Sequence, residues 1–293
     1  MTDRRSFIKS GLFILGGSMI LPLNAFTKTK RKTIGIQLYT VRDALYENLE
    51  NTLNSISSIG YNSLELAGYH ERKFYGLLPS EFKKRVNELG LEINSSHVLF
   101  PLTKEKGECK IMEKWKKAAE DVKNVGATYL VFPYLDPMYR DELTNYHLLS
   151  DNLNKIGEIC KNNELQLAYH NHDFEFFHLD GQIPYNLVLN KTDKQLVKME
   201  IDLYWIIKAG KNPIDYFKSY PGRFPLWHVK DMENSPEKFF AEVGKGTIDF
   251  EPIFSKAKLA GLDYFFVEQD YSRRDPLESI EMSYDYLVNS DFI

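Results

Sequence analysis

The sequence contains only two cysteines in 293 residues, Cys109 and Cys160. Two cysteines cannot form a disulfide framework, and a structural zinc or iron–sulfur site built on thiolates is excluded. Both cysteines lie in segments with helical periodicity, where a small buried hydrophobe is a more common role than a bridge or a reactive thiol.

An excess of positive charge is also missing. The chain has 37 Lys and Arg against 41 Asp and Glu, a formal net charge of -4 and a pI near 6.0. A polyanion is held by a basic field, so nucleic acid is not an expected partner. Small neutral or polar molecules remain as ligands, and a homo-oligomer is left open. With 43% apolar residues, the chain is long enough to build a sizeable core.

The N-terminal apolar stretch, residues 10–23, is too short to span a bilayer comfortably and suits the central part of a signal peptide. The preceding Arg4-Arg5 pair resembles a twin-arginine signal, which directs folded proteins across the bacterial inner membrane. We therefore expect residues 1–30 to be an export segment and the protein to be periplasmic, with no stable membrane span after signal removal. An uncleaved membrane anchor is the alternative, because residues 24–26 match a cleavage site poorly.

After residue 30 the chain alternates strand-like runs with segments that suit helices. The predicted strands are residues 33–39, 62–68, 91–98, 127–134, 165–170, 197–202, 224–231 and 263–269. Strict alternation requires parallel pairing with right-handed crossovers, and eight units in about 260 residues is the size of a closed barrel. An open doubly wound sheet would carry a glycine-rich turn after its first strand, and residues 37–43 contain no glycine. No linker divides the chain, so we predict a single (β/α)8 TIM-barrel domain over residues 31–293.

The ends of the predicted strands are rich in polar side chains, and four of the seven histidines lie there. Active sites of this fold lie at the carboxyl ends of the strands. The polar residues at these ends are Gln37, Tyr39, Glu65, His97, His170, His172, Asp202, His228, Lys230, Asp231 and Glu268.

Imidazole and carboxylate groups from neighbouring strands form a mixed nitrogen and oxygen set that suits one divalent ion, such as Mn²⁺, Zn²⁺, Co²⁺ or Mg²⁺. A lone histidine is more often a hydrogen-bonded core or surface group, and a carboxylate at a strand end often caps a helix. Asp202, His228 and Glu268 end three successive strands, which favours a shared metal site over three separate coincidences.

Four segments, in this order, resemble the sugar phosphate isomerase/epimerase family of xylose-isomerase-like barrels. They are MEIDLYW (199–205), LWHVKD (226–231), VGKGTIDF (243–250) and FFVEQD (265–270). The resemblance covers nearly the whole chain after residue 30. It implies one metal ion held by a carboxylate from the fifth strand, with Asp202, His228 and Glu268 from the next three.

The fifth strand departs from the family pattern. Relatives place a glutamate before an asparagine there, whereas this chain has His170 before Asn171. His170 is the expected replacement ligand, and the two-residue period of a strand then turns His172 toward the substrate. Glu175 is the alternative ligand if the backbone turns back.

The resemblance implies a metal-dependent isomerase or epimerase that acts on a keto sugar or 3-keto glycoside through an enediolate. Catalysis would use Glu268 as base, His172 on the other face of the sugar, and Lys230 as donor to the enediolate oxygen. Alternatives on the same site are a 3-keto-glycoside lyase or hydrolase and inosose-dehydratase-like elimination; another class is a non-catalytic sugar-binding envelope protein. The remaining candidates for contact with a sugar are Gln37, Tyr39, Glu65, His97, Trp205 and Glu175.

Endonuclease activity on the same fold is disfavoured. It needs three metals and therefore more histidines, and the position where the nucleases carry one of them is Trp205 in this chain. The negative net charge also argues against a DNA substrate.

Overall fold

The structure is a computed structural model that describes residues 32–103 and 108–293. The predicted export segment lies outside these residues. One compact unit, Lys32–Ile293, contains everything described below. Within the described residues, no helix combines the length and the apolar character needed to cross a membrane.

Eight parallel strands close into a barrel, as predicted. Around the barrel their order is β1-β12-β9-β8-β7-β6-β5-β2. Each of the eight predicted strand segments contains one of them: β1 (Gly35–Gln37), β2 (Ser63–Leu66), β5 (Glu92–His97), β6 (Tyr129–Phe132), β7 (Gln166–His170), β8 (Val197–Asp202), β9 (Leu226–Val229) and β12 (Tyr264–Val267).

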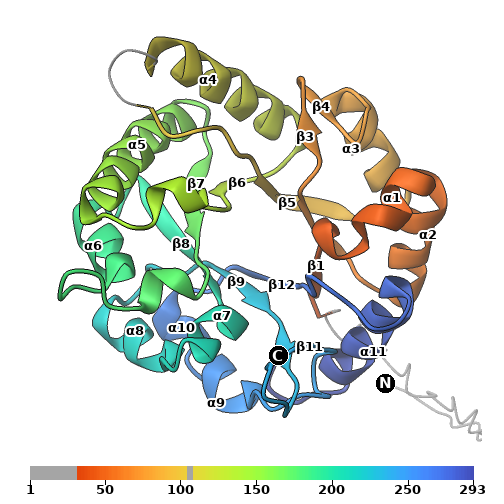
Figure 1. Cartoon of the computed structure of the whole chain (residues 1–293). Coiled ribbons are helices and arrows are strands. Elements are labelled where there is room, and N and C mark those ends of the chain that lie inside the picture. The colour runs from red at the N-terminus through yellow and green to blue at the C-terminus, as the bar shows by residue number, and fades with distance from the viewer. Residues whose placement is uncertain (1–31, 104–107) are drawn as a thin grey trace, which may run out of the picture. The chain divides into compact units, whose positions relative to one another are not determined.

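Helices form a ring around the barrel, as the view along its axis shows (Figure 1). They are α1 (Arg42–Glu47), α2 (Leu49–Ile59), α3 (Pro79–Glu88), α4 (Glu108–Val125), α5 (Leu143–Asn162), α6 (Pro184–Lys191), α7 (Leu203–Lys208), α8 (Pro213–Ser219), α9 (Phe250–Phe254), α10 (Ala257–Ala260) and α11 (Pro276–Val288). Short 3-10 helices are η1 (Leu38–Val41), η2 (Pro137–Tyr139) and η3 (Phe174–Phe176).

Helix α2 illustrates how the sequence sets these elements. The Asn48 side chain accepts a hydrogen bond from the Asn51 amide at the start of the helix, and Gly60 ends it with a φ of 125°. Leu53 and Ile56 between them are buried against the barrel.

The barrel interior has an apolar layer made by alternate residues of the strands. Its members are Tyr129, Val131, Ala168, Leu226 and Phe266. A side chain on Gly35 of β1 would bring a Cβ within 2.5 Å of Phe266 Cδ1, so a glycine lets this ring fill the interior. Polar residues replace this layer nearer the carboxyl ends of the strands, where the fold places function.

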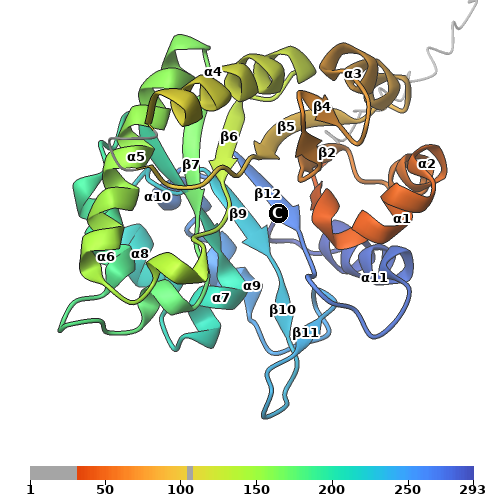
Figure 2. The same cartoon turned by 45° about the horizontal axis from the view of Figure 1, so that its top comes forward.

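Two hairpins extend the barrel at this end, β3 (Tyr69–His70) with β4 (Lys73–Phe74), and β10 (Asp231–Met232) with β11 (Phe240–Ala241) (Figure 2). They follow β2 and β9, so each continues a barrel strand beyond its carboxyl end.

The glycine-containing segment 243–250 wraps around the buried carboxylate of Asp231. That carboxylate accepts hydrogen bonds from the amides of Gly244, Gly246 and Ile248 at 2.9, 2.9 and 3.0 Å. A Cβ on Gly246 would lie 2.3 Å from Asp231 Oδ1, so this approach requires glycine. The segment therefore fixes the end of β9, which carries two of the predicted site residues.

Replacing Asp231 by alanine should lower the free energy of unfolding by about 3 kcal/mol or more, because several amides around it lose their acceptor. Urea denaturation measures the change. The control is Asp249→Ala, which removes an exposed carboxylate from the same segment and should cost less than about 0.5 kcal/mol. Equal losses in the two variants would show that Asp231 does not organise the segment.

Candidate metal centre and active site

A cavity of about 670 Å³ opens at the carboxyl ends of the strands, within the range usual for small-molecule sites. Seven predicted site residues line it: Tyr39, His97, His170, His172, Trp205, Lys230 and Glu268. Five others, Gln37, Glu65, Glu175, Asp202 and His228, are fully buried and do not form part of its wall.

Four of the predicted ligands come together at the floor of this cavity and are called here the upper ligand set: His170, Asp202, His228 and Glu268. Each offers one ligand atom, and these atoms all lie within 4.8 Å of one another. His228 Nδ1 lies 2.6 Å from Glu268 Oε2, and His170 Nε2 lies 3.7 Å from Asp202 Oδ2. The four residues belong to or directly follow β7, β8, β9 and β12, which are adjacent in the barrel.

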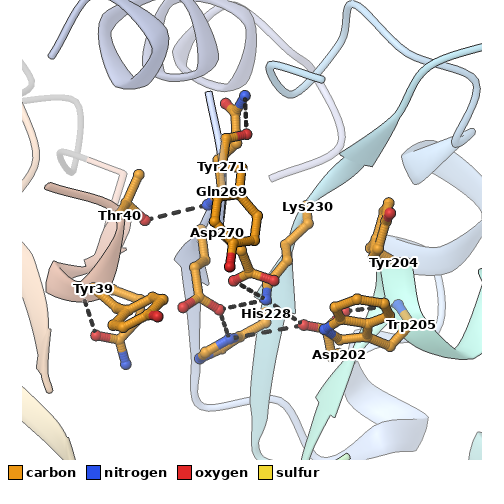
Figure 3. A network of polar contacts seen from close by, with 12 residues as sticks. Tyr39, Thr40, Asp202, Tyr204, Trp205, His228, Lys230, Gln269, Asp270 and Tyr271 are labelled. Carbon is orange, nitrogen blue, oxygen red and sulfur yellow. Dashed lines mark hydrogen bonds and ion pairs between the residues drawn. The ribbon is translucent and has the colours of Figure 1, made fainter. Parts of the chain in front are cut away.

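Lys230 is buried beside the upper ligand set and contacts three carboxylates (Figure 3). Its Nζ lies 3.0 Å from Asp202 Oδ2, 2.6 Å from Glu268 Oε2 and 2.9 Å from Asp270 Oδ1. Burial alone would lower the pKa of Lys230, but the three carboxylates outweigh it and raise this pKa well above its usual value. Three carboxylates thus gather around one ammonium, with His228 Nδ1 as a further partner of Glu268, and a set so rich in carboxylates suits a divalent cation.

Asp202 has one committed oxygen and one available oxygen. Oδ1 caps α7 by accepting the Trp205 amide at 2.9 Å. Oδ2 is buried and has no well-directed hydrogen bond, although it lies within ion-pair distance of Lys230. Burial raises the pKa of Asp202 to about 6, while Lys230 and His228 oppose the shift. A carboxylate oxygen without a hydrogen-bond partner, in a mixed nitrogen and oxygen set, suits a divalent ion.

Glu268 is held as a carboxylate. Burial acts to raise the pKa of Glu268, but Lys230 and His228 outweigh burial and hold this pKa well below its usual range. Its Oε2 lies 2.6 Å from both His228 Nδ1 and Lys230 Nζ, a position that suits a metal ligand. A catalytic role for Glu268 as base stays a prediction.

A second group of donors is called here the lower donor set; it consists of the fully buried Glu65, Glu200 and His228 together with His97, which also lines the cavity. His228 Nε2 lies 2.5 Å from Glu65 Oε2 and 3.2 Å from Glu200 Oε2. His97 Nε2 lies 3.2 Å and 2.8 Å from the same two oxygens. His228 thus presents Nδ1 to the upper ligand set and Nε2 to the lower donor set.

Glu200 was not predicted as a site residue. It precedes Asp202 by two residues on β8, so the strand period turns both side chains into the barrel. The two-residue period of the strand could have identified Glu200 as a site residue from the sequence. Its Oε2 also lies 3.1 Å from His170 Nδ1, which links it to the upper ligand set.

Gln37 lies beneath the site and does not reach the cavity. Its Nε2 donates to Glu65 Oε2 at 2.8 Å, and its Oε1 accepts the Tyr39 amide at 3.0 Å. These contacts position Glu65 and the start of η1, which differs from the substrate contact expected from the sequence.

His172 stands in an aromatic wall of the cavity. Its ring stacks on Phe174 at 5.9 Å between centroids and meets Tyr134 edge-on at 5.1 Å and Trp205 at 5.5 Å. Its Nδ1 has no hydrogen-bond partner among the described residues. Burial, helped by the nearby Lys230 charge, lowers the pKa of His172 well below its usual value. The imidazole is therefore neutral near pH 7 and able to accept a proton.

Three further residues of the cavity wall were not identified from the sequence: Arg140, Asp270 and Tyr271. The Arg140 guanidinium lies 3.6 Å from the Phe174 ring centroid and donates to the Leu135 carbonyl. Tyr271 is 61% exposed, so the mouth of the cavity presents an aromatic face to ligands. Aromatic faces of this kind pack against the apolar face of a sugar ring.

Glu175 points away from the cavity. Its Oε1 accepts the Tyr169 hydroxyl at 2.5 Å, and its Oε2 accepts the His172 amide at 2.8 Å. Tyr169 alternates with His170 along β7 and so faces the helices. With both oxygens engaged on that side, Glu175 holds the loop that carries His172, and the structure does not bring it to the ligands.

The Glu175 carboxyl should make stability depend on pH. Burial raises its pKa to about 8 from an ordinary value of 4.5. The folded state therefore binds this proton more tightly than the unfolded state does. The resulting stabilisation of the fold is complete below about pH 4.5 and is lost as the pH rises toward 8, by at most about 1.4 kcal/mol per pH unit.

Glu175→Gln keeps the shape and removes this titration, so its stability relative to the wild type should improve steadily from pH 5 to pH 8 in urea denaturation. The exposed Glu237→Gln is the control and should leave the difference constant. A constant difference for Glu175→Gln as well would show that the carboxyl is not perturbed.

The barrel and its site define the class, a (β/α)8 barrel with its polar cluster at the carboxyl ends of the strands. Residues 53–288 match the family model described as xylose isomerase-like TIM barrel. The chain belongs to the xylose isomerase-like TIM barrel family.

Individual relatives are similar at modest identity. The chain is 28% identical over 165 residues to an inosose dehydratase of Clostridium botulinum. The aligned segment covers 50% of this chain and 55% of that protein. The chain thus spans about half the length of the curated relatives it matches. A crystal structure of a sugar phosphate isomerase/epimerase from Parabacteroides distasonis superposes with a TM-score of 0.81 at 29% identity, covering 91% of this chain and 97% of that one.

A third comparison concerns fold alone. The IOLI protein, whose crystal structure carries a bound zinc atom, superposes with a TM-score of 0.67 at 18% identity, covering 89% of this chain and 99% of that one.

Proposed function

We propose that the protein is a metal-dependent enzyme that removes the proton beside the carbonyl of a keto sugar or keto polyol and then eliminates water or an alcohol from the next carbon. The observation that carries this proposal is the upper ligand set at the floor of a sugar-sized cavity, with the unpartnered His172 in the wall beside it.

His170, Asp202, His228 and Glu268 would hold the divalent ion. When bound, such an ion acts as a Lewis acid that polarises a carbonyl and lowers the cost of an enediolate. The three carboxylates around Lys230, and Asp202 Oδ2 without a hydrogen-bond partner among the described residues, support its placement there.

His172 is the proposed base. Its neutral imidazole can take the α-proton because the ring lines the cavity and its low pKa keeps the ring unprotonated at neutral pH. The imidazolium formed then supplies a proton to the departing oxygen on the same face of the sugar. One histidine thereby performs both transfers, and the enzyme returns to its starting protonation state.

Lys230 is proposed to stabilise, through its positive charge, the oxygen on which negative charge develops. Its high pKa keeps Nζ protonated, and its position between the carboxylates fixes the ammonium without any movement during the reaction. Trp205 also lines the cavity, and Lys230 Nζ lies 5.8 Å from the centroid of its ring.

Elimination is favoured over epimerisation by the residue on β7. Epimerisation at one carbon needs an acid or base on each face of the sugar, and His170 replaces the glutamate that the resemblance assigns to one face. His170 Nδ1 is hydrogen-bonded to Glu200 at 3.1 Å and Nε2, on the side of Asp202, would hold the ion, so neither nitrogen is free for a second proton transfer. The name of the similar Clostridium botulinum protein, inosose dehydratase, supports elimination; that of the Parabacteroides protein supports epimerisation as the second candidate.

Product analysis tests the proposal. The metal-loaded protein is incubated with a panel of keto inositols, keto sugars and 3-keto glycosides, and the products are analysed by mass spectrometry and NMR. We expect an unsaturated product lighter than the substrate by one water or one alcohol. An epimer of unchanged mass would favour the second candidate, and no turnover of any panel member would contradict both.

A further inference from the structure

We infer that the lower donor set is a second metal site, which binds a divalent cation on the opposite side of the His228 ring from the upper ligand set. This inference goes beyond the proposed reaction, because it concerns ions and ligands that the chemistry at the cavity floor does not require.

The four donor atoms form a closed ring in which nitrogen and oxygen alternate. In order around the ring they are His97 Nε2, Glu200 Oε2, His228 Nε2 and Glu65 Oε2, and the successive separations are 2.8, 3.2, 2.5 and 3.2 Å. Bonds of about 2.0–2.2 Å to Zn²⁺ in a tetrahedral site place neighbouring donors roughly 3.3 Å apart, so these four atoms would have to separate by less than about 1 Å to hold the ion. Small shifts of these side chains therefore suffice to bind an ion.

Charge favours a cation at this position. Glu65 and Glu200 have no exposed surface, and no lysine or arginine of the described residues lies within ion-pair distance of either. The groups that pair with these two carboxylates are the imidazoles of His97, His170 and His228, and a bound cation would place its charge between the same oxygens. The Oε1 atoms of both residues are buried without a hydrogen-bond partner, so each carboxylate has an oxygen left to complete a coordination shell.

Side chains around the four donor atoms hold them in place, as outer-shell residues do around a metal site. Gln37 donates to Glu65 Oε2 at 2.8 Å, and the His97 and His228 rings lie parallel within 10° at 5.4 Å between centroids. Metal-bound carboxylates are commonly held by such outer hydrogen bonds. His170 Nδ1, 3.1 Å from Glu200 Oε2, is a further donor on the same side.

His228 joins the two sites. With a metal on each side, both of its nitrogens are ligand atoms, and its ring releases its protons to solvent as the ions bind. The alternative arrangement has one ion in the upper ligand set, with Glu65 and Glu200 only accepting hydrogen bonds from the other ring nitrogens of His228 and His170. The number of bound ions separates the two arrangements.

The first test is metal content. The full-length protein is stripped with a chelator, reconstituted with Zn²⁺, dialysed and analysed by mass spectrometry of the metal. We expect two equivalents for the wild type and one for Glu200→Gln, which keeps the size of the side chain and removes its charge. Glu242→Gln, at a buried carboxylate paired with Arg274 on another part of the fold, is the control and should retain two. One equivalent in the wild type, or two in Glu200→Gln, would overturn the inference.

The second test does not depend on a variant that folds. Crystals of the wild type reconstituted with Zn²⁺ are measured on both sides of the zinc absorption edge. Two anomalous peaks, one on each side of the His228 ring, are the expected result. A peak in the upper ligand set with none between Glu65 and Glu200 would overturn this inference and leave the proposed reaction standing; a peak only in the lower donor set would instead contradict the proposed reaction.

Discussion

Replacing Asp202 by asparagine should weaken binding of a divalent ion to the upper ligand set by more than about 100-fold, because loss of a direct ligand should exceed the 10- to 100-fold effect of losing an outer-shell partner. Asparagine retains the oxygen that accepts the Trp205 amide, so the cap of α7 is preserved and the fold should remain intact. The charge that faces the ion and Lys230 is lost.

Competition with a chromophoric chelator measures this change. The variant should bind one equivalent fewer than the wild type. Asp173→Asn is the matched control, since Asp173 also lines the cavity but belongs to neither group of donors, and it should retain the full content. Unchanged affinity in Asp202→Asn would remove the upper ligand set as a metal site.

Replacing His172 by glutamine should lower the rate of α-proton removal by about 10²- to 10⁴-fold, the usual contribution of a positioned general base. Glutamine can fill the space beside Phe174 and Tyr134 but cannot accept the proton at neutral pH. Because His172 is not among the upper ligands, metal content should stay that of the wild type.

The rate is measured with whichever panel substrate turns over, under single-turnover conditions so that product release does not conceal the effect. His178→Gln, in the same loop and exposed, is the control and should react as the wild type. A variant at His172 that keeps its metal and its rate would assign the base to another residue.

The strands and helices could be predicted from the sequence because apolar residues recur with a different period in each kind of element. The eight strand segments were identified in this way, and the barrel follows from their alternation. Asp202, His228 and Glu268 were predicted together because parallel strands bring their carboxyl ends to one edge, and the structure places them there with His170.

The rest depends on contacts between segments. Glu200 lies one layer below the strand end, where the depth of the barrel interior decides whether a polar side chain reaches its neighbours. Arg140 and Asp270 lie on loops whose path is set by packing and not by periodicity. Glu175 was considered as a ligand because it lies close to His172 in the sequence. The short helix η3 instead turns its side chain toward Tyr169, away from the cavity.

The histidine on β7 is the most informative departure from the family pattern. Its two nitrogens face Glu200 and Asp202, on two different levels of the barrel. A glutamate at this position would have no second donor atom of this geometry to present to the lower level. This histidine therefore underlies the preference for elimination in the proposed reaction.

Exchange of the α-proton with solvent tests the central claim most directly, because it reports the first chemical step whatever the final product. A keto sugar or keto polyol is incubated in D₂O with the metal-loaded protein, with the chelator-stripped protein, and with stripped protein to which the metal has been returned. Deuterium should enter beside the carbonyl with the loaded protein, fail to enter above the background rate with the stripped protein, and enter again once the metal is restored. Exchange that proceeds equally fast without the metal, or turnover of a substrate with no exchange and no unsaturated product, would contradict a metal-dependent enediolate mechanism.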